Sequence, residues 1–291
     1  MAITAAPASW REAPVGIVGM GLIGGSIGLD LRQQGLAVHA LVHRPSTAER
    51  ALQRGLASVV STDPAVLADC GLVVLALPLD RLLEPDPALL AALPKGAIVT
   101  DVGSVKQPVL QRWQPLHRRF VASHPMAGTA QAGVEAGVAG LFGQRPWVAT
   151  PSDQTDPEAL EGVRQLADCL GAHWLCCTAP AHDEAVALIS HLPVLVSAAL
   201  LATADRGGEL GELARTLASS GFADTTRVGG GNPQLGRLMA SSNREAVLAA
   251  LGDYQSRLGQ LSQLVREGQW DALEAALAHG QQLRPAFVDK P

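Results

Sequence analysis

Four short segments of the chain combine residue types that can move protons and hold anions. They are Asp101–Lys106 (DVGSVK), Ser123–Thr129 (SHPMAGT), Ser190–Pro193 (SHLP) and Gly221–Pro233 (GFADTTRVGGGNP). An imidazole such as that of His124 titrates near neutral pH, which suits a general base. The planar guanidinium of Arg227 matches a carboxylate better than an ammonium does. These residue types suit acid–base chemistry on a small molecule that carries carboxylates.

Each candidate also has a structural interpretation. His124 follows a predicted strand, where a histidine can simply be hydrogen-bonded within the core. His191 lies on an apolar segment and can pack there as an ordinary helix residue. Ser104 precedes Gln107 by three residues, which is a capping box, so helix initiation alone would explain this serine.

The charged neighbours of these segments have the same two interpretations. Asp224 precedes Arg227 by three residues, so it belongs either to a substrate-binding network or to a surface ion pair. His182 is interpreted as a helix-capping or solvent-exposed residue. Lys106 is interpreted as a surface charge.

A GxGxxG sequence links the first predicted strand, Val15–Gly19, to a predicted helix over Leu22–Gln33. In such a motif the first glycine turns the chain, the second lets the backbone approach a pyrophosphate, and the third lets helix and strand pack closely. The phosphates bind at the helix N-terminus. The pattern predicts a bound dinucleotide, with Gly19, Gly21, Leu22, Ile23 and Gly24 as its binding residues.

The second predicted strand, Val38–Val42, is not followed by the acidic residue that would bind a ribose 2′-hydroxyl. The chain continues with an arginine and two hydroxyl residues, which suit a 2′-phosphate. Alternatively, Ser46 only caps the next helix in a capping box with Glu49, and Arg44 is a solvated charge. We predict NADP in preference to NAD, bound by His43, Arg44, Ser46 and Thr47.

The elements that must position these residues follow an alternating pattern. Short apolar runs alternate with segments of helical period, which predicts an α/β fold with a Rossmann-type parallel sheet. Ser104–Gln107 and Thr155–Glu158 are expected to start helices as capping boxes, and Gly171 to end the helix that begins at Pro157. The predicted strands are Val15–Gly19, Val38–Val42, Leu72–Leu77, Ala97–Val102, Phe120–Ser123, Trp147–Thr150 and Trp174–Cys177.

Strand patterns end near Ala179. We therefore predict a loose extension over residues 1–14, a dinucleotide-binding domain over 15–179, and a helical substrate and dimerisation domain over 180–291. Pro193 should kink the apolar helix there. A helix starting at Ser242 or Asn243 carries an apolar stripe. The stripe either packs within the domain or forms a homodimer interface, and we predict the homodimer. The stripe is Val247, Leu251, Tyr254, Leu258, Leu261 and Val265.

Composition limits the possible partners and the cellular location. A net charge of −5 and an aromatic content of 3% argue against nucleic-acid binding. The longest apolar runs are shorter than the ~18 residues of a membrane helix, so no membrane partner is expected. The four cysteines lack metal-ligand spacing and no signal peptide is recognised, so we expect no metal and a cytoplasmic location.

The four segments, in this order, resemble the prephenate/arogenate dehydrogenase family, and most closely its cyanobacterial-type arogenate dehydrogenases. The resemblance runs from Val15 to about Trp270. It implies oxidative decarboxylation of a small molecule, arogenate or prephenate, with transfer of the ring C4 hydride to NADP+. The C4 hydroxyl becomes a carbonyl, CO2 leaves from C1, and the ring aromatises to a phenol.

The resemblance also implies roles for individual residues. His124 hydrogen-bonds the ring hydroxyl and takes its proton, and Ser104 lies between this histidine and the nicotinamide. Arg227 binds a substrate carboxylate, Asp224 holds that arginine or joins the network, and His191 lies near the active cleft.

Two departures from the prephenate-using members favour arogenate. Those members commonly read SHLPH, whereas this chain has Val194 at the final position. They also carry a tryptophan after the Asn/Asp-Pro motif, whereas Asn232-Pro233 is followed here by Gln234. Prephenate is the alternative substrate.

Two further interpretations compete. A β-hydroxyacid dehydrogenase or imine reductase would use a lysine or aspartate on the interdomain helix, and the helix after Ala179 has no lysine. A non-catalytic NADP sensor would not need His124, Ser104 and Arg227 together.

Overall fold

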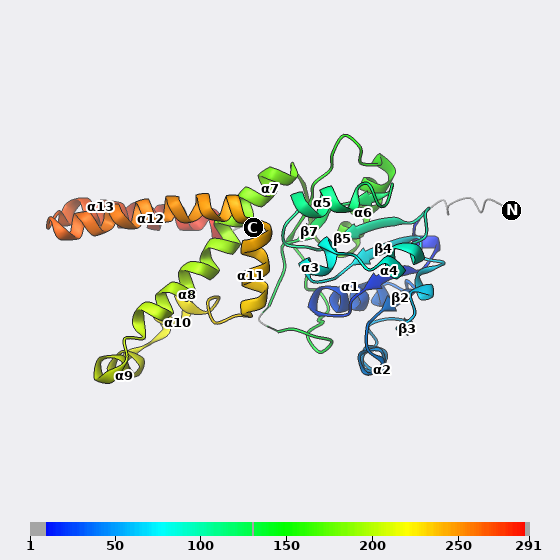
Figure 1. Cartoon of the computed structure of the whole chain (residues 1–291), viewed down its shortest axis with the longest axis horizontal. Coiled ribbons are helices and arrows are strands. Elements are labelled where there is room, and N and C mark those ends of the chain that lie inside the picture. The colour runs from blue at the N-terminus through cyan, green and yellow to red at the C-terminus, as the bar shows by residue number, and fades with distance from the viewer. Residues whose placement is uncertain (1–9, 130, 289–291) are drawn as a thin grey trace. The chain divides into compact units, whose positions relative to one another are not determined.

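The computed structural model describes residues 10–129 and 131–288. The chain divides into two compact units, one up to Asn243 and one from Arg244 onward. The first unit holds all the described strands and the helices through α11. Figure 1 labels these helices along the chain.

The main sheet of the first unit has six strands in the order β3-β2-β1-β4-β5-β6. All of its neighbouring strands are parallel. This is the order of a doubly wound dinucleotide-binding fold, in which ligands bind at the carboxyl edge where the order reverses, next to β1. The strands are β1 Val15–Val18, β2 Val38–Leu41, β3 Val59–Ser61, β4 Leu72–Leu75, β5 Ile98–Asp101 and β6 Phe120–Val121.

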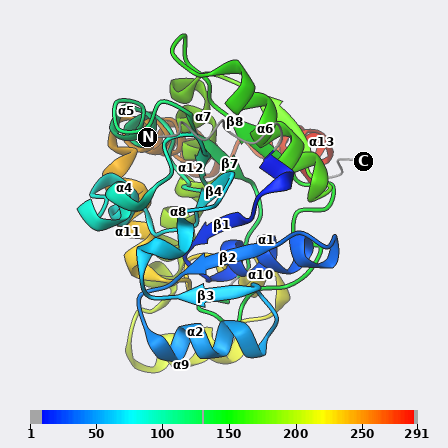
Figure 2. The same ribbon diagram turned by 90° about the vertical axis from the view of Figure 1, so that its right-hand side faces the viewer.

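Helices cover both faces of this sheet because its strands are apolar on both sides (Figure 2). On one face Ile17 and Val74 pack with α1 (Leu22–Gln33) and α6 (Pro157–Cys169). On the other face Val18 and the neighbouring strand residues pack with four shorter elements. These are η2 Pro64–Leu67, α3 Leu79–Leu83, α4 Pro87–Ala92 and α5 Gln107–Trp113.

The chain interrupts the predicted strand Phe120–Ser123 at Ala122 and enters a second sheet. In this sheet β7 pairs antiparallel with β8, and β8 pairs parallel with β9. His124 is therefore in β7 of the small sheet. The sequence did not predict β3, a half-exposed strand at the edge of the main sheet. The second sheet comprises β7 Ser123–Pro125, β8 Pro146–Ala149 and β9 His173–Cys176.

The three predicted capping boxes are wrong, although the helices begin close to them. The helix α2 (Pro45–Gln53) begins at a proline and has no side-chain cap. In α6 it is Asp156, not the predicted threonine, that accepts from the backbone N–H of Glu158. Proline at the first helical position pre-sets the backbone there. It starts α2 one residue before Ser46 and starts α6 two residues after the expected threonine. The predicted stop of α6 is confirmed, because Gly171 has φ +70°.

The N-terminal prediction needs one correction. Residues 1–9 of the expected loose extension lie outside the described residues. Trp10–Glu12 forms a 3-10 turn, η1, and Trp10 is buried against the core. Its indole Nε1 donates to Gln165 Oε1 at 3.2 Å. This part of the segment is thus tied to α6.

From Ala179 the first unit is helical. The helix α7 (Ala179–Val186) continues through a π-helical turn, η3 (Ala187–His191), into α8 (Leu192–Ala204). The irregular turn lies directly before Pro193, which has no backbone N–H to donate. The continuous helix Ala179–Ala204 is long and apolar enough to cross a membrane, judged by length and composition alone. Core helices of soluble proteins meet the same two criteria. Three helices follow it: α9 Gly208–Leu217, α10 Ser220–Thr226 and α11 Pro233–Ser242.

The second unit is a helical hairpin of α12 (Arg244–Arg266) and α13 (Trp270–Val288), which pack on each other. The helix α12 begins one residue after the predicted start at Ser242 or Asn243. Large apolar side chains are exposed on both helices, among them Leu258, Leu277 and Phe287. The domain boundary near Ala179 stays a prediction.

Candidate active site

The glycine-rich turn after β1 has the geometry that a pyrophosphate needs. Gly19 has φ +95°, and a Cβ there would lie 2.4 Å from the Ala76 carbonyl oxygen. A Cβ on Gly24 would lie 2.0 Å from the Gly19 carbonyl oxygen, so helix and turn approach as the motif requires. Gly21 faces open space and offers no side-chain cap to α1. The first amides of α1, those of Leu22 and Ile23, are therefore free to hold phosphate oxygens.

The end of β2 presents groups suited to a further phosphate. His43, Arg44 and Ser46 are exposed and Thr47 is half-buried. None of these four side chains has a hydrogen bond or ion pair within the described part of the chain. Ser46 is inside α2 and does not cap it, so its interpretation as a helix cap is wrong.

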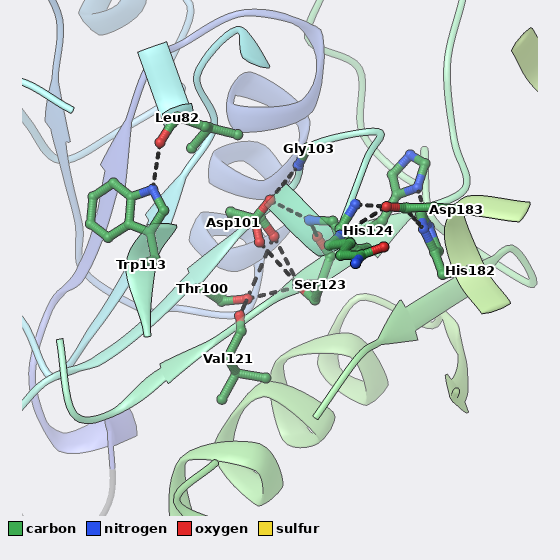
Figure 3. Close-up of polar contacts among 12 residues, drawn as sticks. Leu82, Thr100, Asp101, Gly103, Trp113, Val121, Ser123, His124, His182 and Asp183 are labelled. Carbon is green, nitrogen blue, oxygen red and sulfur yellow. Dashed lines mark hydrogen bonds and ion pairs between the residues drawn. The ribbon is translucent and has the colours of Figure 1, made fainter. Parts of the chain in front are cut away.

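His124 meets a second histidine rather than an isolated polar group. Its Nδ1 lies 3.0 Å from Nε2 of His182, and the two rings meet edge to face with centroids 5.2 Å apart (Figure 3). His182 Nδ1 in turn lies 2.8 Å from Oδ1 of Asp183. His182 is buried, so its expected role as an exposed or capping residue is wrong. The three side chains form a hydrogen-bonded chain from α7 to β7.

Asp183 also fixes the start of α5. Its Oδ1 accepts from the backbone N–H of Lys106 at 2.7 Å, and its Oδ2 from that of Gln107 at 2.8 Å. This carboxylate, and not Ser104, caps the helix, because acidic groups bind the free amides at a helix N-terminus. Asn243 Nδ2 donates to the backbone carbonyl of Asp183 at 2.7 Å. Both the carboxylate and the backbone carbonyl of Asp183 are therefore held in place.

Lys106 is fully buried and paired, so its interpretation as a surface charge is wrong. Its Nζ forms an ion pair with Asp101 and donates to the Ser123 carbonyl at 2.6 Å. Asp101 also accepts from the backbone N–H groups of Gly103 at 2.8 Å and Ser123 at 3.1 Å. The pair thereby joins the end of β5 to the start of β7, one residue before His124. Figure 3 labels Asp101 and Ser123 at this junction.

Ser123 is held by a second set of contacts beneath the site. Its hydroxyl donates to the Asp101 carbonyl at 2.9 Å and accepts from Trp147 Nε1 at 3.0 Å. Thr100 Oγ1 lies 2.8 Å from the same hydroxyl. All four residues are buried. The backbone that carries His124 is therefore fixed on the side facing the main sheet.

The surroundings of His124 favour its neutral form. Burial lowers the pKa of His124 well below its usual value, and the charges of Lys106, His182 and His191 act in the same direction. Burial likewise lowers the pKa of His191 to about 4, although Asp183 opposes that shift. A neutral imidazole at pH 7 is able to accept a proton.

The remaining predicted residues are distributed over two regions. Ser104 is half-buried in the β5–α5 connection. His191, in η3, is buried near Asn243, whose Nδ2 is 3.3 Å from its Nδ1, and its Nε2 has no partner among the described residues. Asp224 lies on α10 and Arg227 directly follows it, away from any described contact with His124. Across residues 10–129 and 131–288, neither of these two forms an ion pair.

The sequence did not predict the roles of His182, Asp183, Asp101 and Lys106. A His-Asp pair at the start of an apolar helix was the available signal for the first two. The spacing of Asp101 and Lys106 around a glycine was the signal for the others. Neither pattern shows by itself that the residues meet, because 58 positions separate His124 from His182.

The doubly wound sheet, the glycine turn and the histidine site at the same sheet edge define a nucleotide-dependent dehydrogenase. The model of the prephenate dehydrogenase nucleotide-binding domain matches residues 27–176. The model of the prephenate dehydrogenase dimerisation domain matches residues 178–279. The chain belongs to the prephenate dehydrogenase family, whose members include arogenate dehydrogenases, and is an oxidoreductase of aromatic amino acid biosynthesis that uses a nicotinamide cofactor.

Relatives match nearly the whole chain. The structure of arogenate dehydrogenase from Synechocystis is 40% identical and covers 94% of this chain and 100% of its own, with a TM-score of 0.79. The structure of prephenate dehydrogenase from Aquifex aeolicus in complex with hydroxyphenyl propionate and NAD+ is 28% identical. It covers 94% of this chain and 98% of its own, with a TM-score of 0.88. Prephenate dehydrogenase from Bacillus subtilis is 28% identical over 86% of this chain and 70% of its own.

A 3-hydroxyisobutyrate dehydrogenase from Mycobacterium tuberculosis is 14% identical with a TM-score of 0.56. This likeness shows a shared fold alone. The β-hydroxyacid dehydrogenase interpretation therefore gains no support beyond the architecture.

Proposed function

We propose that this protein is an arogenate dehydrogenase that converts L-arogenate to L-tyrosine and CO2 with NADP+ as hydride acceptor. The observation that carries the proposal is His124: its Nδ1 is occupied by His182, while its Nε2 has no partner among the described residues. The histidine follows β6 at the carboxyl edge of the sheet, where ligands of such folds bind. The 40% identity to an arogenate dehydrogenase supports the choice of substrate.

His124 supplies the acid–base chemistry. Its Nε2 accepts the proton of the C4 hydroxyl as that carbon becomes a carbonyl. Bound nicotinamide supplies the acceptor for the C4 hydride. The electron pair of the C1–carboxylate bond enters the ring as CO2 leaves, and the resulting phenolate oxygen takes the proton back from His124. The proton count is then balanced. Ser104 would hold the ring hydroxyl or orient the imidazole.

Arg227 is proposed to hold a substrate carboxylate. It is exposed, and within the described residues its guanidinium has no carboxylate partner, so both edges of the planar group are available. Asp224, one helical turn before it, would hold this guanidinium once substrate is bound. His191 presents a buried Nε2 without a described partner and is proposed to face the same ligand.

NADP+ is proposed on the groups at the end of β2. Arg44 is exposed at the N-cap of α2 and would pair with the 2′-phosphate. Ser46 and Thr47, in the first turn of α2, offer hydroxyl and amide donors to the same group, with His43 beside them. No acidic residue among positions 42–48 would repel it.

The preference for arogenate rests on Val194. This residue is half-buried on α8, and its Cγ1 faces Gly236. Its isopropyl group offers nothing polar to the keto-acid side chain of prephenate. Acceptors that serve the ammonium of arogenate would be left unpaired by a keto group, at a cost of roughly 1–3 kcal/mol per buried group.

The decisive experiment follows NADPH or NADH formation by the purified protein with arogenate or prephenate, each with NADP+ or NAD+. We expect kcat/KM for arogenate to exceed that for prephenate by tenfold or more, with NADP+ preferred. Val194→His should narrow the gap by improving prephenate, whereas the control Val196→His should not. A wild-type preference for prephenate would support the second candidate, prephenate dehydrogenase, which the Aquifex likeness favours.

His124→Asn tests the base. We expect kcat to fall by about 10²- to 10⁴-fold, the usual range for a general base, while cofactor affinity holds. Fluorescence titration with NADPH measures that affinity independently of turnover. Wild-type turnover in this variant would reassign the base to His191.

A homodimer is proposed as the working form, since the chain carries a dimerisation domain and exposes large apolar side chains on α12 and α13. We further propose that it works in the cytoplasm, where the thiols of its free cysteines stay reduced.

A further inference from the structure

We infer that His182 and Asp183 are positioning residues that set the tautomer of His124 and take over the positive charge when His124 accepts a proton. The inference rests on the proposed function for its kinetic consequences. Its structural basis is the hydrogen-bonded chain from Asp183 through His182 to His124 Nδ1.

The direction of this chain follows from Asp183. An ionised carboxylate can only accept hydrogen bonds, so His182 Nδ1 must carry the proton in the 2.8 Å contact. In neutral His182, Nε2 then has only a lone pair and acts as acceptor. His124 Nδ1 therefore carries the proton in the 3.0 Å contact. This leaves the lone pair of His124 on Nε2, the atom without a described partner.

Without the hydrogen bonds from Asp183 through His182, the tautomer of His124 would be undetermined. A neutral imidazole can place its proton on either nitrogen, and only one arrangement leaves Nε2 able to act as a base. An aspartate that holds a catalytic histidine in the correct tautomer has the same function in serine proteases, where its conversion to asparagine lowers kcat about 10⁴-fold. Here the aspartate acts through an intervening histidine.

The same contacts provide a path for the second proton. When Nε2 of His124 takes the substrate proton, Nδ1 can pass its own proton to Nε2 of His182. His124 becomes neutral again, and His182 becomes an imidazolium beside the Asp183 carboxylate. The histidine pair has gained one proton from the substrate, and a second proton has passed from His124 to His182. The pair therefore carries one positive charge in total, so the step is balanced.

The charges around the pair favour this transfer. The charge of Lys106 disfavours a positive charge on His124. Asp101 is already paired with Lys106. Asp183 is the carboxylate in contact with the histidine pair, and it touches His182. A positive charge is accordingly better placed on His182 than on His124.

The hydrogen-bonded chain of Asp183, His182 and His124 is held rigidly enough to set the tautomer of His124. Asp183 is 4% exposed and accepts the two backbone N–H groups at the start of α5, while Asn243 holds its carbonyl. His182 is 3% exposed and its backbone N–H donates to the Thr178 carbonyl at 3.0 Å. Pre-organised partners of this kind lose little entropy when the reaction begins.

The kinetic test is His182→Gln, which keeps a side-chain acceptor for His124 Nδ1 but cannot take a proton. We expect kcat to fall at least 100-fold with KM changed less than threefold. The matched control is His117→Gln, which removes a buried histidine bonded to the Pro94 carbonyl. It should leave both kcat and KM within threefold of wild type.

The direct test uses nitrogen NMR of the ligand-free protein with 15N-labelled histidine. The chain has eight histidines, and loss of one signal set in His124→Asn assigns the relevant ring. At pH 8 we expect Nδ1 of His124 to be protonated and Nε2 unprotonated. This readout needs no turnover, so it is independent of whether arogenate is the substrate.

Two results would overturn the inference: an unprotonated Nδ1 on His124, or kcat within threefold of wild type in His182→Gln. If the protein oxidised neither arogenate nor prephenate, the proposed function would fail while the NMR result would still decide the tautomer.

Discussion

The buried ion pair of Lys106 and Asp101 allows a sharp prediction about stability. Both side chains are fully buried, and the ammonium also donates to the Ser123 carbonyl. Lys106→Met preserves most of the volume, so it leaves little cavity. It leaves the Asp101 carboxylate buried with only two backbone N–H donors. Removing one partner of a buried pair costs about 3–5 kcal/mol, whereas an exposed ion pair contributes about 1 kcal/mol or less.

Urea unfolding at fixed protein concentration measures this cost, since association makes stability depend on concentration. The control is Lys95→Met, which removes an exposed lysine and should change the free energy of unfolding by no more than about 0.5 kcal/mol. Adding Asp101→Asn to Lys106→Met should recover about 2 kcal/mol, because no uncompensated charge is then buried. A loss below about 1 kcal/mol in Lys106→Met would refute the reasoning.

The same variant has a kinetic signature. The charge of Lys106 contributes to lowering the pKa of His124, after burial. Its removal should raise that pKa and move the acidic limb of kcat/KM to higher pH.

Three further predictions follow from the cofactor turn, η3 and the helical hairpin. Arg44→Ala should weaken NADP+ binding tenfold to more than a hundredfold, as expected for a charge-assisted bond of roughly 1.5–3 kcal/mol, and leave NAD+ unchanged in calorimetric titration. Equal losses would mean that Arg44 serves the fold. Stability should fall between pH 6.5 and 4, because the pKa of His191 is about 4 when folded and the unfolded chain takes up the proton first. His191→Gln should flatten that dependence in urea midpoints, the exposed His279→Gln should not, and equal slopes would count against the assignment. Light scattering should give twice the chain mass of 30.2 kDa, and a monomer would contradict the dimer.

Much of the fold could be predicted because its signals are local. The alternation of apolar strands and helices is a property of neighbouring residues, and the glycine turn after β1 depends on the missing Cβ atoms of Gly19 and Gly24. His124 and Arg44 were also predictable as candidates, since their types and their positions after strands indicate chemistry. The helix starts were less accurate. Proline at the first helical position and distant acceptors decided them.

The break between β6 and β7 shows where local signals end. The sequence from Phe120 to Ser123 is apolar enough for one strand, yet Thr150 donates to the Ala122 carbonyl and the chain passes to a second sheet. That exchange depends on β8, more than twenty residues away. Pairing partners of this kind leave no trace in the strand's own pattern.

The sequence by itself determined the class of fold, the cofactor turn and the residue types of the site, because each depends on backbone geometry or on chemistry within a few positions. Only the tertiary structure decided which polar groups meet. It buried Lys106 against Asp101, and it brought His182 and Asp183 from α7 to the side of His124. The physical reason is that a buried charge or imidazole must find its partner in space, and here the partners come from different elements of the chain.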